Sequence, residues 1–267
     1  MRFLSVAVAA TVAAVFGSAG VAAAAPKDYC ADLKGANTGR TCEIQLSDPG
    51  YSVDISIPLD FPDQKSVADY ISQTRDTFLN TAKSGAARTT PYVLSMEPAE
   101  YSSSVPPRGT QAVVFSITQD IGSGPQRTYK SFNWDQTFRK EITYTAAPDD
   151  KQNTPLWRVD DPLKTVAPIV QSELQQQLAP PPAAPPTPTT STTPTTTTTP
   201  TTATTSAPPP APLPFSQAAL YNPANYQNFA VVNDGVIFFF DQGVLLPASA
   251  GPLHVLVPRS QIDPMIA

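Results

Sequence analysis

A run of proline and threonine divides the sequence and limits what can fold. Residues 179–214 hold 13 prolines, 14 threonines and 2 serines among 36 residues, and none is charged. Because the segment has almost no apolar surface, burial cannot offset the entropy lost on ordering. We predict a disordered, extended tether, partly in the polyproline-II conformation. The same composition is typical of O-glycosylated stalks, and whether the run carries sugars stays open.

The first residues have the pattern of a secretory signal peptide. Residues 1–25 carry one basic residue, Arg2, before an apolar stretch from Phe3 to Phe16 and a run of small residues that ends at Ala25. That pattern predicts cleavage near the end of the alanine run. A transmembrane anchor is disfavoured because the apolar part is shorter than the roughly 20 residues that a span needs. We expect a secreted protein, extracellular or associated with the cell envelope, without a transmembrane segment.

The charge of the chain excludes one class of partner. The formal net charge is −5, and the sequence has no basic block. Binding to nucleic acid depends on cations that neutralise phosphates, so we expect no nucleic-acid partner. We expect a monomer that needs no cofactor and binds a host or envelope protein or a lipid surface.

Two cysteines, Cys30 and Cys42, lie close together after the predicted signal peptide. An exported chain can be oxidised, and an even number of closely spaced cysteines indicates one disulfide. The short loop that it closes implies a stabilisation of about 3 kcal/mol. A metal site would need more ligands, and the single histidine, His254, lies far along the chain, so we predict no metal site.

Before the tether, the hydrophobic pattern alternates between strand and helix. Residues 51–57 are apolar at every second position, which predicts a half-buried strand. Residues 62–84 place Val67, Ile71 and Phe78 on one helical stripe, with Pro62 as the first helical residue. Further strands are expected over 90–103, 110–120, 127–138 and 140–145, and a second helix over 161–178, with Pro168 limiting its first turn.

After the tether, a hairpin signal stands out. Residues 222–229 predict a helical turn. The strands "FAVV" (229–232) and "VIFFF" (236–240) flank Asn233-Asp234-Gly235, whose Asp-Gly pair favours a tight hairpin. "VIFFF" is apolar on both faces, so we expect a strand that is covered on both sides, central or adjacent in the sheet. A short strand over 252–258 and a terminal turn or helix complete the chain.

Fifty residues after the tether are few for an independent core. We therefore predict one α+β domain formed by residues 26–178 and 215–267, a mixed sheet packed on helices and interrupted by the insertion at 179–214. Two separate domains on a linker are the alternative.

The sequence lacks the G-x-S-x-G, H-E-x-x-H, P-loop and G-x-G-x-x-G motifs. A serine hydrolase could use only His254 as its base, with Ser249 or Ser260 as neighbouring serines. Since alternation in residues 252–258 places His254 on the less buried strand face, we assign no catalytic residue.

Acidic pairs and aromatic residues are the remaining candidates for functional side chains. Asp160 and Asp161 are interpreted as solvated loop charge and as caps of the second helix; the pair at 149–150 is interpreted as loop charge. Aromatic side chains are enriched at interfaces and in ligand grooves, which makes Trp134, Phe138 and Tyr226 candidate binding residues. Core packing is the alternative for each ring.

Several stretches carry a family resemblance. They are "KDYCADLKGANTGRTC", "FPDQKSVADYISQTRDTFL", "PPRGTQAVVF", "YKSFNWDQTFRKEITY", "DPLKTVAPIVQSEL" and "NYQNFAVVNDGVIFFFDQGVLLPASAGPLHVLVPRSQID". Together they resemble the mycobacterial secreted immunogenic-protein family, known for its 64-numbered antigen. That family carries a domain of unknown function also found in a lysozyme-sensing anti-sigma factor. The Pro/Thr run departs from the short connection associated with the family.

The resemblance implies an exported mycobacterial-type antigen with a β-grasp-like α+β fold, and it is consistent with the Cys30–Cys42 disulfide. Our leading hypothesis is a non-enzymatic binding protein at the host or cell-envelope interface. Some family members have been described as esterases, so a weak serine-type carboxylesterase using His254 is the runner-up. A lysozyme-binding module is a third hypothesis, which depends on fold analogy alone.

Overall fold

The computed structural model describes residues 27–85, 88–105, 108–145, 151–178 and 215–267. The predicted signal peptide and tether lie outside these residues, as do Asp149 and Asp150. Within the described ranges, no helix is both long and apolar enough to cross a membrane.

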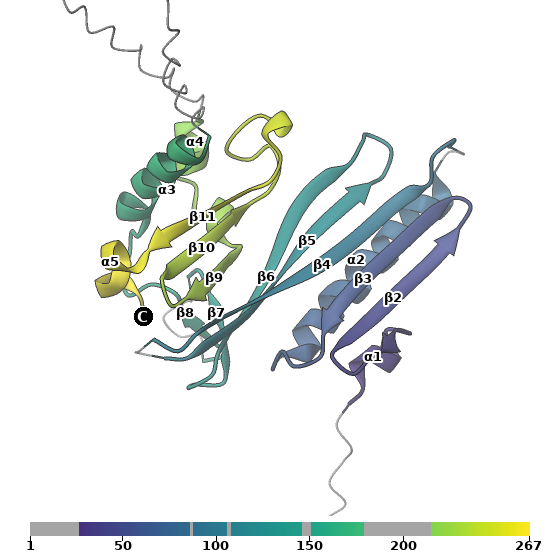
Figure 1. The fold of residues 1–267 in the computed structure, drawn as a ribbon, viewed down its shortest axis with the longest axis horizontal. Helices are drawn as coiled ribbons and strands as arrows, with labels where there is room; N and C mark the ends of the chain where they lie inside the picture. Colours follow the sequence, from purple (N-terminus) through teal and green to yellow (C-terminus); the bar gives the residue numbers. More distant parts are fainter. Residues whose placement is uncertain (1–26, 86–87, 106–107, 146–150, 179–214) are drawn as a thin grey trace, which may run out of the picture.

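The larger of two sheets has eight strands, and their spatial order follows the chain from β1 to β8 (Figure 1). The strands are β1 (Ala36–Asn37), β2 (Thr41–Asp48), β3 (Tyr51–Pro58), β4 (Tyr92–Ser103), β5 (Thr110–Asp120), β6 (Gln126–Asp135), β7 (Lys140–Thr143) and β8 (Asn153–Pro155). Neighbours are antiparallel except for β3–β4 and β7–β8, which are parallel. The sheet is therefore mixed, as predicted, but its simple strand order does not confirm a β-grasp arrangement.

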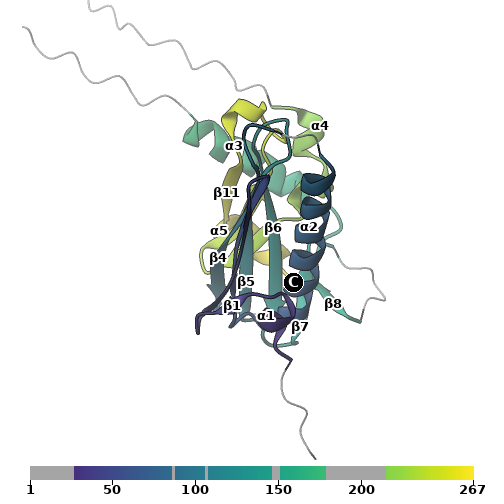
Figure 2. The same cartoon turned by 90° about the vertical axis from the view of Figure 1, so that its right-hand side faces the viewer.

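Helix α2 (Gln64–Ser84) makes the crossover that the parallel β3–β4 pair requires. It lies along one face of the large sheet (Figure 2) and buries Val67, Ile71 and Phe78 there, the predicted stripe. The helix begins at Gln64, two residues later than predicted. Asp63 is its N-cap and accepts a 3.2 Å hydrogen bond from the Ser66 N–H, so Pro62 precedes the helix.

The predicted disulfide is present and fixes the N-terminal end of the large sheet. The bond joins Cys30 in α1 (Tyr29–Asp32) to Cys42 in β2. Both cysteines are almost completely buried, and they belong to the same apolar cluster as the inner face of α2.

The segment after residue 214 forms its own three-stranded antiparallel sheet, with β10 in the centre. Its strands are β9 (Phe229–Val232), β10 (Gly235–Phe240) and β11 (Leu253–Pro258). Shorter elements surround them, namely α4 (Gln217–Leu220), η1 (Pro223–Tyr226), η2 (Ala248–Ala250), α5 (Arg259–Ile262) and η3 (Asp263–Met265). The expectation that these strands join the first sheet is wrong, because they pair only with one another.

The β9–β10 hairpin matches the prediction. Val232 pairs with Gly235, which leaves Asn233 and Asp234 as the two loop residues. Gly235 has φ +155°, and a Cβ there would collide with the carbonyl oxygen of Val257 on β11. Glycine is thus required by the close approach of β11 as well as by the turn.

Helix α3 (Leu163–Gln177) packs on the outer face of the small sheet, beside β11 (Figure 1). Its N-cap is Pro162, which has no capping side-chain hydrogen bond, so the prediction that Asp160 or Asp161 caps the helix is wrong. Asp161 forms an exposed ion pair with Lys164 instead (3.2 Å). Pro168 lies inside the helix, which continues through it to Gln177.

Strand β10 is covered on both faces, as its sequence predicts. Phe238 and Phe240 face α3, whereas Phe239 points to the large sheet and contacts Ala112 and Val114 of β5 through the inter-sheet cluster. The small side chains of this cluster allow the two sheets to pack closely.

Side chains from the C-terminal segment also occupy the edge of β6. Strand β7 pairs only with Trp134 and Asp135, at the end of β6. The earlier part of β6 therefore has no partner strand on that side. There, the N–H groups of Arg127, Tyr129 and Ser131 donate to side-chain oxygens that lie after residue 214. The acceptors are Gln242 (3.0 Å), Asp241 (2.7 Å) and Asn228 (3.1 Å). Segments from both sides of the Pro/Thr run thus complete each other's hydrogen bonding.

Candidate functional site

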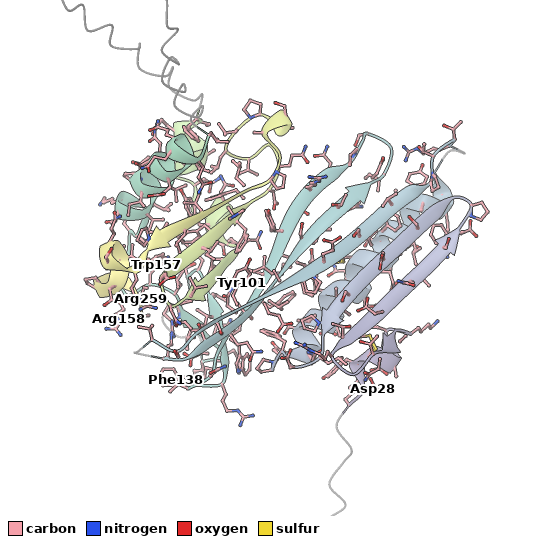
Figure 3. All side chains as sticks on the ribbon, viewed as in Figure 1. Asp28, Tyr101, Phe138, Trp157, Arg158 and Arg259 are labelled. Carbon is pink, nitrogen blue, oxygen red and sulfur yellow. A yellow bond between two sulfur atoms is a disulfide. The ribbon has the colours of Figure 1, made fainter. Side chains whose placement is uncertain are left out.

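The turn between β6 and β7 presents an aromatic ring to solvent. Phe138, one of the predicted binding aromatics, is 62% exposed and lies at the lower end of the molecule in Figure 3. Exposing so large an apolar side chain forfeits its burial energy, which is of the order of 2 kcal/mol. We therefore treat this turn as the candidate binding site.

A buried carboxylate holds the turn. Asp135 is fully buried, and its Oδ1 accepts hydrogen bonds from the N–H groups of Thr137 (2.8 Å) and Phe138 (2.9 Å). The Arg139 N–H donates to the Asp135 carbonyl (2.8 Å), and Arg139 adopts φ +54°. An aspartate that bonds to the backbone just after it fixes a tight turn. Phe138 is consequently exposed on a rigid scaffold.

Arg108 neutralises this carboxylate from the β4–β5 connection. Its Nη1 lies 3.0 Å from Asp135 Oδ2, and its Nη2 donates to the Pro155 carbonyl (2.8 Å). Burial lowers the pKa of the Arg108 guanidinium, and the negative charge of Asp135 opposes that effect. No sequence pattern signals this pair, because its two members meet only through the pairing of β5 with β6.

Trp134, the second predicted aromatic, lies at the base of the same turn. It is partly buried against the α2 cluster and lines an open cavity of about 390 Å³. The cavity lining is Asp63, Ser66, Trp134, Arg139, Lys140, Glu141, Gln152 and Asn153. Charges of both signs and one indole make this hollow suited to a polar side chain of a partner.

Tyr226, the third predicted aromatic, belongs to the core. Its side chain is fully buried, and its ring lies 5.2 Å from each of the rings of Phe238 and Phe240. The hydroxyl donates to the Leu220 carbonyl (2.7 Å), and burial raises the pKa of the phenol. The binding role suggested for Tyr226 is corrected here, because its ring cannot reach a partner.

His254 is exposed on β11, whereas its neighbours Leu253 and Val255 are buried, as the alternation predicted. Its ring stacks on Phe239 at 6.2 Å. Within the described ranges, neither Ser249 nor Ser260 forms a hydrogen bond with His254. The same ranges contain no group of three or more acidic, histidine or cysteine side chains placed to hold a metal ion.

His254 does line a second, smaller cavity where the two sheets diverge. This inter-sheet cleft has a volume of about 190 Å³ and is lined by Glu97, Ala99, Tyr101, Val114, Ser116, Tyr129, Phe239 and His254. Sequence reasoning missed it because its walls come from strands β4, β5, β6, β10 and β11.

Several known proteins are similar to this chain. The family described as a protein of unknown function (DUF3298) matches residues 155–260. Two solved members of that family, from Pseudomonas aeruginosa PAO1 and Bacteroides fragilis NCTC 9343, align with TM-scores of 0.48 and 0.43 at 10% and 11% identity. The alignments cover 85% and 87% of this chain and 93% and 96% of those structures.

Mycobacterial relatives are much more similar in sequence. Immunogenic protein MPB64 of Mycobacterium bovis and immunogenic protein MPT64 of Mycobacterium tuberculosis are each 47% identical, over 93% of this chain and 92% of theirs. Esterase Rv3036c of M. tuberculosis is 34% identical over 99% of both chains. Identity of this degree along nearly the whole length shows that the chain belongs to the family of the mycobacterial immunogenic proteins MPB64 and MPT64.

Proposed function

We propose that the chain is an exported, non-enzymatic binding protein that acts at the host or cell-envelope interface through its β6–β7 turn. The observation that carries the proposal is the 62% exposure of Phe138 on a turn held by the buried Asp135. A pre-ordered aromatic ring loses little conformational entropy on binding, and such rings are frequent binding hot spots.

Other features support export and a role outside the cell. The N-terminal sequence has the pattern of a signal peptide, and Cys30 and Cys42 form a disulfide. The most similar mycobacterial relatives reported above are named immunogenic proteins. The hydrogen bonds from Asn228, Asp241 and Gln242 to β6 support one domain made of residues 26–178 and 215–267.

The test compares two exposed apolar residues that lie beyond opposite ends of β6. Phe138→Ser removes the ring of the proposed site, and Ile121→Ser removes a side chain that is 44% exposed in the β5–β6 turn. Labelled variants are titrated against fractionated host membranes, envelope fractions and soluble host proteins. We expect Phe138→Ser to weaken the dominant interaction at least about tenfold, as for a hot spot, and Ile121→Ser to leave it unchanged. Equal effects of the two changes would remove the site from consideration.

Weak ester hydrolysis is the second candidate, because one relative is named an esterase and because Ser116 lines the same cleft as His254. The assay uses short-chain nitrophenyl esters with the wild type, Ser116→Ala and His254→Ala. Turnover abolished by both substitutions would establish this activity and contradict the non-enzymatic proposal. Absence of turnover in the wild type would eliminate it.

A further inference from the structure

The inter-sheet cleft has an ordered floor. Glu97, Ser116 and Tyr129 are direct partners across β4, β5 and β6, so their side chains form one row on the face toward the small sheet. Ala99 and Val114 belong to the next row. Their small or short side chains leave the space that the cleft occupies.

Aromatic rings form the walls. Phe239 of β10 is almost completely buried, and its ring lies 5.7 Å from that of Tyr101 and 5.2 Å from that of Tyr129. The imidazole of His254 also stacks on Phe239, with ring centroids 6.2 Å apart. Tyr101 lies where the two sheets meet (Figure 3).

The charge of the cleft is negative. Glu97 is exposed, and it is the single Asp, Glu, Lys or Arg among the eight lining residues. Within the described ranges its carboxylate forms no ion pair. Burial raises the pKa of both Tyr101 and Tyr129, so these phenols are neutral at pH 7 and add no competing charge.

We infer that the inter-sheet cleft binds an organic ammonium group, held between the rings of Tyr101, Tyr129 and Phe239 and paired with the carboxylate of Glu97. The faces of aromatic rings carry negative potential and attract alkylammonium ions, most strongly when several rings surround the cation. An anion would be repelled by Glu97, and a purely apolar ligand would desolvate its carboxylate without a partner. This inference is independent of the proposed function of the β6–β7 turn.

Size limits the ligand to a head group. A volume of about 190 Å³ is below the range of roughly 300–1,000 Å³ that is usual for drug-sized ligands. The cleft is open to solvent, so the rest of a larger molecule can remain outside. A small free amine and a trimethylated lysine side chain both supply the required chemistry.

The experiment uses two probes of the same shape that differ in charge. Choline is titrated into the purified protein, followed by its neutral isostere 3,3-dimethylbutan-1-ol, and the backbone amide shifts of Ser116 and Tyr129 are recorded by NMR. We expect saturable shifts with choline and binding of the alcohol at least about fivefold weaker, because the alcohol loses the cation–π and carboxylate interactions. Equal binding of the two probes, or no binding of choline up to about 100 mM, would overturn the inference.

Variants then locate the site. Glu97→Gln should weaken choline binding about fivefold, and Tyr129→Leu about tenfold, as for loss of a partly desolvated ring. Glu100→Gln is the matched control. It removes the same charge from the same strand, but Glu100 lines a different cavity, with Gly39 and Leu59. If Glu100→Gln weakens binding as much as Glu97→Gln, the effect is one of net charge and the site is refuted.

A final arm separates the two sources of the head group. N-acetyl-trimethyllysine amide carries the ammonium on a peptide-like backbone, whereas choline does not. Tighter binding of the lysine derivative would assign the cleft to a polypeptide ligand, and tighter binding of choline would assign it to a small amine. Thermal melts of each variant report whether the fold is intact, and Glu97→Gln changes an exposed side chain, so it leaves the core unaltered.

Discussion

Oδ1 of Asp241 accepts a 2.7 Å hydrogen bond from the backbone N–H of Tyr129, which ties the end of β10 to the edge of β6. Burial raises the pKa of the Asp241 carboxyl above its usual value of 3.8, and the hydrogen bond from Tyr129 only partly opposes this. The folded protein therefore binds a proton at this site more tightly than the unfolded chain does.

The consequence is a stability that depends on pH. A carboxyl whose pKa is raised on folding stabilises the fold fully below pH 3.8, and this contribution is lost as the pH rises through the folded-state pKa. Asp241→Asn keeps an acceptor oxygen but cannot titrate. We expect the unfolding free energy of the wild type to fall relative to that of Asp241→Asn over this window, measured by urea unfolding at several pH values. Parallel pH profiles of the two proteins would contradict the assignment.

Removing the acceptor of this hydrogen bond altogether should lower the free energy of unfolding more than Asp241→Asn does. Asp241→Ala leaves the Tyr129 N–H without its partner in a partly buried position. We expect a loss of about 1–2 kcal/mol at pH 7, measured by urea unfolding. Asp241→Asn at the same pH is the control, and a loss of equal size in both variants would show that the hydrogen bond contributes little.

Cleavage within residues 179–214 should leave the two parts of the protein associated. The small sheet packs on β5 through Ala112, Val114 and Phe239, and its flanking side chains bond to the edge of β6. After limited proteolysis, both fragments should elute together in gel filtration and separate only in denaturant. Elution as two native peaks would favour two domains on a linker.

Breaking the buried pair of Arg108 and Asp135 should be strongly destabilising. Arg108→Met leaves the carboxylate of Asp135 buried without its cation, which we expect to cost about 3 kcal/mol by urea unfolding. Adding Asp135→Asn removes the stranded charge and should restore part of the loss. Lys65→Met, which breaks the exposed pair with Asp69, is the control and should change stability little. A similar loss in both single variants would argue against this account.

Gly235 should tolerate alanine far less well than Gly122. A Cβ at Gly235 would meet the Val257 carbonyl, whereas at Gly122, with φ +120°, it would meet open space. We expect a cost of at least about 3 kcal/mol for Gly235→Ala and about 1 kcal/mol for Gly122→Ala, from thermal or urea unfolding. Equal costs would show that backbone strain alone matters at both positions.

Local elements followed closely from the sequence. Alternation in residues 51–57 and the stripe of Val67, Ile71 and Phe78 correspond to β3 and α2, and Asp234-Gly235 marks the hairpin. Periodicity describes what covers the two faces of a strand. Periodicity does not indicate which other strands pair with that strand. For this reason "VIFFF" was expected in the sheet formed by the upstream residues, whereas β10 lies in the separate three-stranded sheet.

The site residues show the same limit. A strand was expected over 127–138, but β6 ends at Asp135 and Phe138 lies in the turn that follows, whereas Tyr226 lies in the short helix η1. In segments this short no repeat distinguishes an inward ring from an outward one, and of these two rings only Phe138 is exposed. Asp135 and Arg108 were missed because their charges meet through the register of β5 and β6. For the same reason the row of Glu97, Ser116 and Tyr129 appears only when the sheet is assembled.

The edge of β6 has a consequence for self-association. Exposed strand edges template pairing with other chains and so promote aggregation. Arg127 and Tyr129 have both their N–H and their C=O groups engaged, by the backbone and side chain of Gln242 and by the side chains of Asp241 and Asn228. These two residues therefore have no unpaired backbone group with which a strand of a second molecule could pair. The protein is protected at this edge against β-sheet polymerisation at high concentration.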